Sequence, residues 1–169
     1  MMQPNPVAPY TLSTVYSMSV QLANVSGSAT WLSANAGVFV PFRVSTPSVV
    51  KNLFCDNGTV ASGNVDMGIY TMDGVRLVSA GSTAQAGTTA LQIFNIDDTV
   101  LGRGTYYLGI ALDNTTGTIN RSNTLTRYLA PFGYIQKASV FPLPATITFS
   151  SNDIGNCGPA IGLTMEPLV

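Results

Sequence analysis

The fold is decided between residues 65 and 112, which contain the segments V-D-M-G-I-Y (65–70), T-M-D-G-V-R-L-V (71–78), A-L-Q-I-F-N-I (90–96) and T-Y-Y-L-G-I-A-L (105–112). In each segment large apolar residues alternate, or nearly alternate, with small or polar ones. Clusters of Gly, Asp or Ser separate the segments. This pattern is typical of successive antiparallel strands that each bury one face.

The clearest strand is 105–112. It places Tyr106, Leu108, Ile110 and Leu112 on one side and Tyr107, Gly109 and Ala111 on the other. The two small residues on the second side would permit close approach of a second sheet or a neighbouring chain. In the segment 65–70 we expect Val65, Met67 and Ile69 to face inward, followed by a tight hairpin at Asp73-Gly74.

Residues upstream continue the alternation. Residues 38–44 place Val38, Val40, Phe42 and Val44 on one face, although Pro41 should confine that strand to an edge or a bulge. A further strand is predicted at 48–54. In residues 15–22 a strand would face inward with Tyr16, Met18, Val20 and Leu22.

The remaining strands are weaker. Asp97-Asp98-Thr99 and Gly102-Arg103-Gly104 are expected to break the chain, and short strands are predicted at 125–129, 145–150 and 161–165. Roughly eight to ten short strands and no helix indicate an all-β protein. We predict an antiparallel two-sheet β-sandwich of jelly-roll type with an extended N-terminal arm.

The chain divides into two parts in this interpretation. Residues 1–36 form the N-terminal extended arm and first strand, and residues 37–169 form the β-sandwich domain. Prolines fix the backbone and remove donors, so the start of the chain should be extended. The residues expected to serve as an assembly arm are Pro4, Pro6, Pro9 and Tyr10.

Charge is sparse along the whole chain. Charged residues are 9% of the sequence, with seven basic and eight acidic side chains, against roughly 25% in an average soluble domain. No basic field exists to attract nucleic acid, and no apolar run of about 20 residues suits a membrane span. The surface is either solvated by Ser, Thr and Asn or covered by partners, and we favour partners. Without a visible secretory signal, we expect synthesis in the cytoplasm before assembly.

Residues for catalysis are scarce. The chain has no His, which removes the most common general base and His-based zinc sites. Its only Glu is Glu166, and nearly all the Asp residues are expected at turns: Asp66, Asp73, Asp97, Asp98, Asp113 and Asp153. A calcium site at Asp97, Asp98 or Asp113 lacks EF-hand spacing, and no phosphate-binding motif is present. We predict no catalytic residues, no metal, no cofactor and no enzyme activity.

Two cysteines and several aromatic residues leave alternatives open. Cys55 and Cys157 either pair across the domain or stay as two buried free thiols, and we favour the thiols. Trp31 is either a sugar-stacking platform or, as we favour, a core or interface anchor. Tyr70, Tyr106, Tyr107 and Tyr128 could contribute to a saccharide-binding sheet face, but we expect at least two of them in the core.

Two longer segments carry a family resemblance. These are G-N-V-D-M-G-I-Y-T-M-D-G-V-R-L-V-S-A-G-S-T (63–83) and G-T-Y-Y-L-G-I-A-L-D-N-T-T-G-T-I-N-R (104–121). Their pattern of strand, Asp-Gly hairpin and Gly-Tyr-Tyr strand resembles β-sandwich virion proteins of tailed bacteriophages, over about residues 38–121. Such proteins serve as capsid decoration (cement) proteins, head fibres or tail receptor-binding modules. The resemblance carries no site residues.

The resemblance implies a non-enzymatic virion structural protein, with a capsid decoration protein as the leading hypothesis. Its partners would be the major capsid protein or other virion proteins, and it would form homo-oligomers, with a trimer favoured. Its location would be the virion, after synthesis in the host cytoplasm. The alternative is a carbohydrate- or receptor-binding module of a tail fibre or tail tip, with Trp31 and Tyr107 as glycan or partner contacts.

Overall fold

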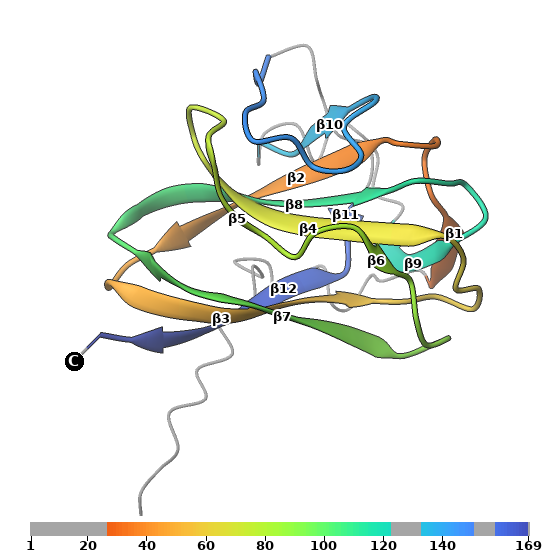
Figure 1. The fold of residues 1–169 in the computed structure, drawn as a ribbon, viewed down its shortest axis with the longest axis horizontal. Coiled ribbons are helices and arrows are strands. Elements are labelled where there is room, and N and C mark those ends of the chain that lie inside the picture. Colours follow the sequence, from red (N-terminus) through yellow and green to blue (C-terminus); the bar gives the residue numbers. More distant parts are fainter. Residues whose placement is uncertain (1–26, 123–132, 151–157, 169) are drawn as a thin grey trace, which may run out of the picture.

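The computed structural model describes residues 27–122, 133–150 and 158–168 (Figure 1). Within these ranges the chain forms β-strands and no helix, which confirms the all-β prediction. The strands are β1 (Ser28–Thr30), β2 (Gly37–Val44), β3 (Ser48–Asp56), β4 (Asn64–Thr71), β5 (Arg76–Ser79), β6 (Thr83–Ala84), β7 (Leu91–Leu101), β8 (Gly104–Leu112), β9 (Thr118–Ser122), β10 (Ile135–Lys137), β11 (Gly158–Pro159) and β12 (Ile161–Pro167).

The strands form two stacked layers. The larger sheet has the order β10-β2-β8-β4-β5, with β6 also paired to β4, and the smaller sheet has the order β12-β3-β7. A third small sheet, β1-β9-β11, lies at one end (Figure 1). All the strand pairs are antiparallel. This arrangement is compatible with a β-sandwich.

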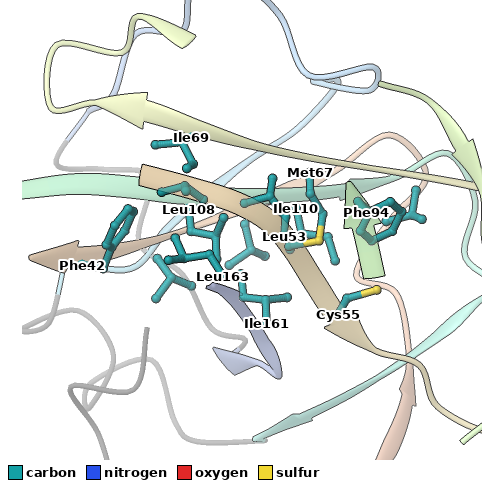
Figure 2. Close-up of a cluster of buried hydrophobic side chains, with 14 of the residues drawn as sticks. Phe42, Leu53, Cys55, Met67, Ile69, Phe94, Leu108, Ile110, Ile161 and Leu163 are labelled. Atoms are coloured by element: carbon teal, nitrogen blue, oxygen red, sulfur yellow. The ribbon is translucent and has the colours of Figure 1, made fainter. Parts of the chain in front are cut away.

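The main core fills the space between the two layers, as Figure 2 shows. The larger sheet contributes the predicted inward residues of β2, β4 and β8, and Met67, Ile69 and Leu108 are fully buried. The smaller sheet contributes Leu53 and Cys55 from β3 and other apolar residues from β7 and β12. The inward faces predicted from alternation in these three strands of the larger sheet are therefore confirmed, because the residues of these faces belong to the main core or pack against it.

The outer face of the larger sheet is also buried. Residues 138–150, which follow the edge strand β10, lie over it (Figure 1), and a second apolar cluster forms there. Phe39, Tyr70 and Tyr107 of the sheet meet Leu143 and other residues of this covering segment. Gly109 allows the fit, because a Cβ there would lie 2.7 Å from Cε1 of Phe39. The space beside Gly109 is thus filled by rings of the neighbouring strands, Phe39 and Tyr70. The chain's own covering segment, and not a second sheet, packs against these rings.

Two expectations about strand breaks and ends need correction. The predicted break at Asp97-Asp98 is wrong, because β7 continues through both residues to Leu101. A register shift opposite β3, between Val50 and Asn52, accommodates them. The strand predicted at 145–150 is reduced to an isolated bridge between Thr146 and Val75. The strand predicted at 161–165 is confirmed as β12.

Pro41 lies where the sequence predicts an edge. The neighbouring strand β10 pairs only with residues Gly37 to Phe39 of β2. Pro41 has no N–H to donate, and no described strand lies beside it on that side to need one. Several other predictions lie outside the described residues. They are the arm with Pro4, Pro6, Pro9 and Tyr10, the strands at 15–22 and 125–129, and the side chains of Tyr128, Asp153 and Cys157.

Candidate functional site

The smaller sheet exposes apolar side chains on its outer surface, which we call the open face. On β7, Leu91, Ile93 and Val100 are 61%, 65% and 61% exposed. The intervening residues Phe94 and Ile96 point the other way and are buried in the core. Large aliphatic side chains are rarely this exposed on neighbouring positions of one strand, so the open face is a candidate interaction surface.

Strand β3 extends the open face across the sheet. Phe54 pairs with Ile93, and Val49 pairs with Val100. The Phe54 ring lies over Gly162 of β12, where any side chain would overlap it. Phe54 and Val49 are half-buried. The open face therefore has two apolar areas, one around Ile93 and Phe54 and one around Val49 and Val100.

Polar side chains lie between and beside these two areas. Asn52 pairs with Asn95 and donates from Nδ2 to Oγ1 of Thr164 at 3.3 Å. Lys51 Nζ lies 2.7 Å from Glu166 Oε2 in an exposed ion pair. Because that pair neutralises itself, the charges that remain at the face are Asp97 and Asp98 at the β7 bulge and Asp56, which pairs with Leu91 and accepts a hydrogen bond from Asn120. Such a composition suits a protein interface better than a site for a charged ligand.

The outer face of the larger sheet has a different character, because buried polar groups hold its covering segment. Asp66 is 1% exposed and accepts hydrogen bonds from Ser79 Oγ at 2.8 Å and from the Leu143 backbone N–H at 2.9 Å. Tyr70 donates its hydroxyl to the Pro144 carbonyl at 2.7 Å. Arg76 donates to the Leu143 carbonyl. These bonds fix the path of residues 143 and 144 over the sheet.

Burial changes the acidity of these groups. Desolvation raises the pKa of the Asp66 carboxyl, against hydrogen bonds from Ser79 and Leu143 that favour its charged form. Desolvation also raises the pKa of the Tyr70 hydroxyl. A buried acid with a raised pKa is a candidate for acid-base chemistry. Here both groups have partners that tie down the covering segment, so their role in this fold is structural.

A second polar cluster closes the end of the molecule near β1. Gln85 Nε2 donates to Asn57 Oδ1 at 3.0 Å and to the Thr118 carbonyl at 2.9 Å. Asn57 in turn donates from Nδ2 to the Ala86 carbonyl at 2.8 Å. Since these buried amides satisfy one another and the loop backbone, the cluster secures the connection between β6 and β7.

The aromatic residues predicted as glycan or partner contacts are buried. Trp31 is 2% exposed, lies in the main core and donates from Nε1 to the Ala36 carbonyl at 2.8 Å. Tyr107 is 6% exposed, its ring centroid lies 4.6 Å from that of Phe149, and burial raises its pKa. A sugar stacks on an exposed ring, so contact at either position would require the ring to become exposed. Tyr70 is buried and Tyr106 is half-buried.

Sites for small ligands or metals are sparse in the described ranges. No group of three or more His, Cys, Asp or Glu side chains lies close enough to hold a metal ion there. A hollow of about 150 Å³ lies at the β2–β3 turn beside Arg43 and Met165. Drug-sized ligands usually occupy about 300–1,000 Å³, so this hollow is small for one. None of the described elements is an apolar helix of membrane-spanning length.

The open face was not predicted from the sequence. Residues 91 and 93 were assigned to a strand, but the face on which their side chains lie was left open because Leu91, Ile93, Phe94 and Ile96 are all apolar. One signal in the sequence could have revealed the open face. Apolar residues stand at every second position from Leu91 to Ile93 and then at adjacent positions at Ile93-Phe94. That pattern indicates apolar side chains on both faces of a strand.

Comparison of the chain with protein-family models, with curated proteins and with solved structures finds no match. The function of the protein is therefore inferred from the surfaces and side chains described above.

Proposed function

We propose that this chain is a non-enzymatic structural protein of a bacteriophage virion, and specifically a capsid decoration (cement) protein. The observation that carries the proposal is the open face, where Leu91, Ile93 and Val100 are exposed together on one sheet. The class of partner comes from the resemblance of residues 38–121 to virion β-sandwiches. The major capsid protein or another virion protein would cover this face.

The physical chemistry of the open face favours docking by apolar packing. Burying apolar surface contributes roughly 25 cal/mol per Å², and the self-neutralised Lys51–Glu166 pair needs no charged partner. Few ion pairs would form across such an interface. Attachment should therefore depend little on salt concentration, since screening acts on charges and not on apolar contacts.

The strand order supports the finer fold assignment, a jelly-roll type of sandwich. Strands β2-β8-β4-β5 stack on β3-β7. The chain passes from one layer to the other between β2 and β3, between β3 and β4, between β6 and β7, and between β7 and β8. Repeated passage between two antiparallel sheets is a feature of jelly rolls. Strand β12, which flanks β3, adds to this arrangement.

Oligomers are the second part of the proposal. The sandwich would form trimers or other symmetric clusters on the capsid surface. The arm at Pro4, Pro6, Pro9 and Tyr10 would reach a neighbouring subunit and enlarge the contact. Deleting residues 1–9 should then weaken attachment while leaving the domain folded.

The experiment compares two double variants on purified particles of the phage whose genome encodes the chain. Leu91→Ser with Ile93→Ser changes the open face. Met72→Ser with Val75→Ser is the matched control, because those side chains are 48% and 47% exposed at the β4–β5 turn, away from that face. Loss of two interface anchors costs about 2 kcal/mol or more, so we expect occupancy to fall at least about tenfold for the first variant only.

Two outcomes would overturn this proposal. Absence of the protein from purified particles would remove the virion assignment. Equal occupancy for both double variants would remove the open face as the docking surface. The glycan-binding alternative has less support, because Trp31 and Tyr107 are buried, and binding on a glycan array by the wild-type protein would favour it.

A further inference from the structure

The edge of β7 lacks a partner strand in the part of the chain that the structure describes. β7 lies at the end of the order β12-β3-β7, so β3 pairs with it on one side only. Gln92 binds the Ala84 carbonyl and the Ala86 N–H near the start of β7. From Ile93 onward no described strand continues the sheet. An unpaired edge presents a row of backbone donors and acceptors that a further strand can use.

The opposite layer is also incomplete at this edge. β5, the last strand of the larger sheet, lies next to β7 across the sandwich. Val78 of β5 and Ala80, which directly follows β5, pack against the core but are only half-buried. A strand added to β7 would lie over β5 and could bury these apolar side chains from above.

The described chain begins beside the start of β7. Thr59 donates its backbone N–H to Ser28 Oγ at 2.9 Å, and Thr89 donates to the neighbouring Gly58 carbonyl at 2.6 Å. Thr89 comes two residues before β7. In Figure 1, β1 and the start of β7 lie at the same end of the molecule, on the right. The residues that precede Gly27 therefore join the domain at the end of the molecule where β7 starts.

We propose that residues 15–22 of the same chain add to the free edge of β7 as an antiparallel strand. Five residues, 23–27, separate Leu22 from Ser28 and can span roughly 20 Å when extended. β7 reaches Ile93 four residues after Thr89, a span of roughly 14 Å at most. The reach is sufficient. Because the end of the segment at Leu22 is tied near the start of β7, the two strands run in opposite directions.

The side-chain pattern of the segment fits this place. Its apolar residues Tyr16, Met18, Val20 and Leu22 alternate with Val15, Ser17, Ser19 and Gln21. In an edge strand the apolar set would face inward over Val78 and Ala80, and the mainly polar set would face outward. The open face would stay exposed. This inference does not depend on the proposed function.

One consequence concerns the first residues of the chain. A strand antiparallel to β7 would run from the Asp97-Asp98 end of β7 back to its start. Residues 1–14 would then leave the domain at the far end from β1, beside the β7–β8 turn at Gly102 and Arg103. The arm with Pro4, Pro6 and Pro9 would therefore project from a fixed point on the sandwich.

The test is amide hydrogen exchange, resolved by residue, on the purified full-length protein. We expect the alternate β7 amides that point away from β3 to exchange slowly from Ile93 onward. Met18→Pro with Ser19→Pro removes donors of both alternating directions within the segment and should speed exchange of those amides at least about tenfold. Val7→Pro, in the part of the chain already rich in proline, is the control and should change nothing.

Three outcomes would overturn the inference. Fast exchange of the outward β7 amides in the wild-type protein would show that no strand is added. Unchanged protection in the Met18→Pro, Ser19→Pro variant would show that another segment covers the edge. Protection that falls on dilution, together with dissociation seen by sedimentation, would assign the added strand to a second copy of the chain.

Discussion

The outer faces of the two sheets differ in what lies on them. Residues 138–150 cover the larger sheet. Asp66 accepts a hydrogen bond from this cover, and Tyr70 and Arg76 donate hydrogen bonds to it. The smaller sheet exposes Leu91, Ile93 and Val100. Exposure of apolar side chains on the smaller sheet is therefore not a general property of this sequence, because the same chain covers the apolar outer face of the larger sheet.

The largest expected difference comes from truncating a leucine on each side. Leu143 is 1% exposed and Leu91 is 61% exposed. Leu143→Ala leaves a cavity under the covering segment and should lower the free energy of unfolding by about 2–5 kcal/mol. Leu91→Ala should cost less than about 1 kcal/mol, because its side chain is already in water. Urea denaturation measures both. Equal losses would mean that Leu91 is buried in solution, and so would contradict the comparison.

A smaller difference should come from adding one methyl group on each side. In Gly109→Ala the new Cβ would lie 2.7 Å from Cε1 of Phe39, whose ring is fully buried and has no room to move. The expected loss is about 1–3 kcal/mol. In Gly162→Ala the obstacle is the Phe54 ring, which is half-buried and can swing toward solvent. We expect less than about 1 kcal/mol there. Thermal unfolding of the two variants would decide, and a costlier Gly162→Ala would show that Phe54 is held firmly.

The smallest effect concerns pH and the cover of the larger sheet. Burial raises the pKa of Asp66 above its ordinary value of 3.8, so the folded protein binds that proton more tightly than the unfolded chain does. The contribution of Asp66 to stability should therefore grow as the pH falls from the folded-state pKa to about 3.8, and be lost as the pH rises. Asp66→Asn removes this contribution. The measurement is the free energy of unfolding of both proteins from pH 7 to below pH 3.8.

The wild-type protein should gain stability relative to Asp66→Asn on acidification. A relative loss instead would mean that the charged carboxylate is the form the fold prefers. Asp113 behaves in the opposite way and serves as a control. Desolvation would raise its pKa, but hydrogen bonds from Asn114 and Asn64 outweigh that effect and lower it. Its stabilisation is present above pH 3.8 and is lost on acidification below that value.

Much of the fold could be predicted from alternation. Val65, Met67 and Ile69 face the main core, and so do Leu108 and Ile110, because successive side chains of a strand point to opposite faces. Asp66 stands in the same strand and was expected, with nearly all the other Asp residues, at a turn. It is buried because Ser79 and Leu143 supply hydrogen bonds from 13 and 77 positions away. Pairings at such separations leave no local signal.

The candidate site was harder to predict than the fold. Asp97 and Asp98 suggested a turn, but the bulge opposite β3 lets both side chains stay exposed within a continuous strand. That bulge sets the faces of Ile93 and Val100, which lie on either side of it. Trp31 and Tyr107 were predicted as glycan or partner contacts under the alternative function, and both are buried. Alternation gives the two faces of a strand, but it does not say which faces the rest of the chain will cover.

The Cys55 thiol has a consequence for experiments on both sheets. It lies in the core between the layers, and burial together with the neighbouring Asp56 raises its pKa to about 12. The thiolate is the form that attacks alkylating reagents, so Cys55 should be modified only in molecules whose layers have separated. The labelling rate of the peptide that contains Cys55 therefore reports how often the sandwich opens, without any introduced probe. Binding of a partner to the open face would slow that rate exponentially with the stability that it adds.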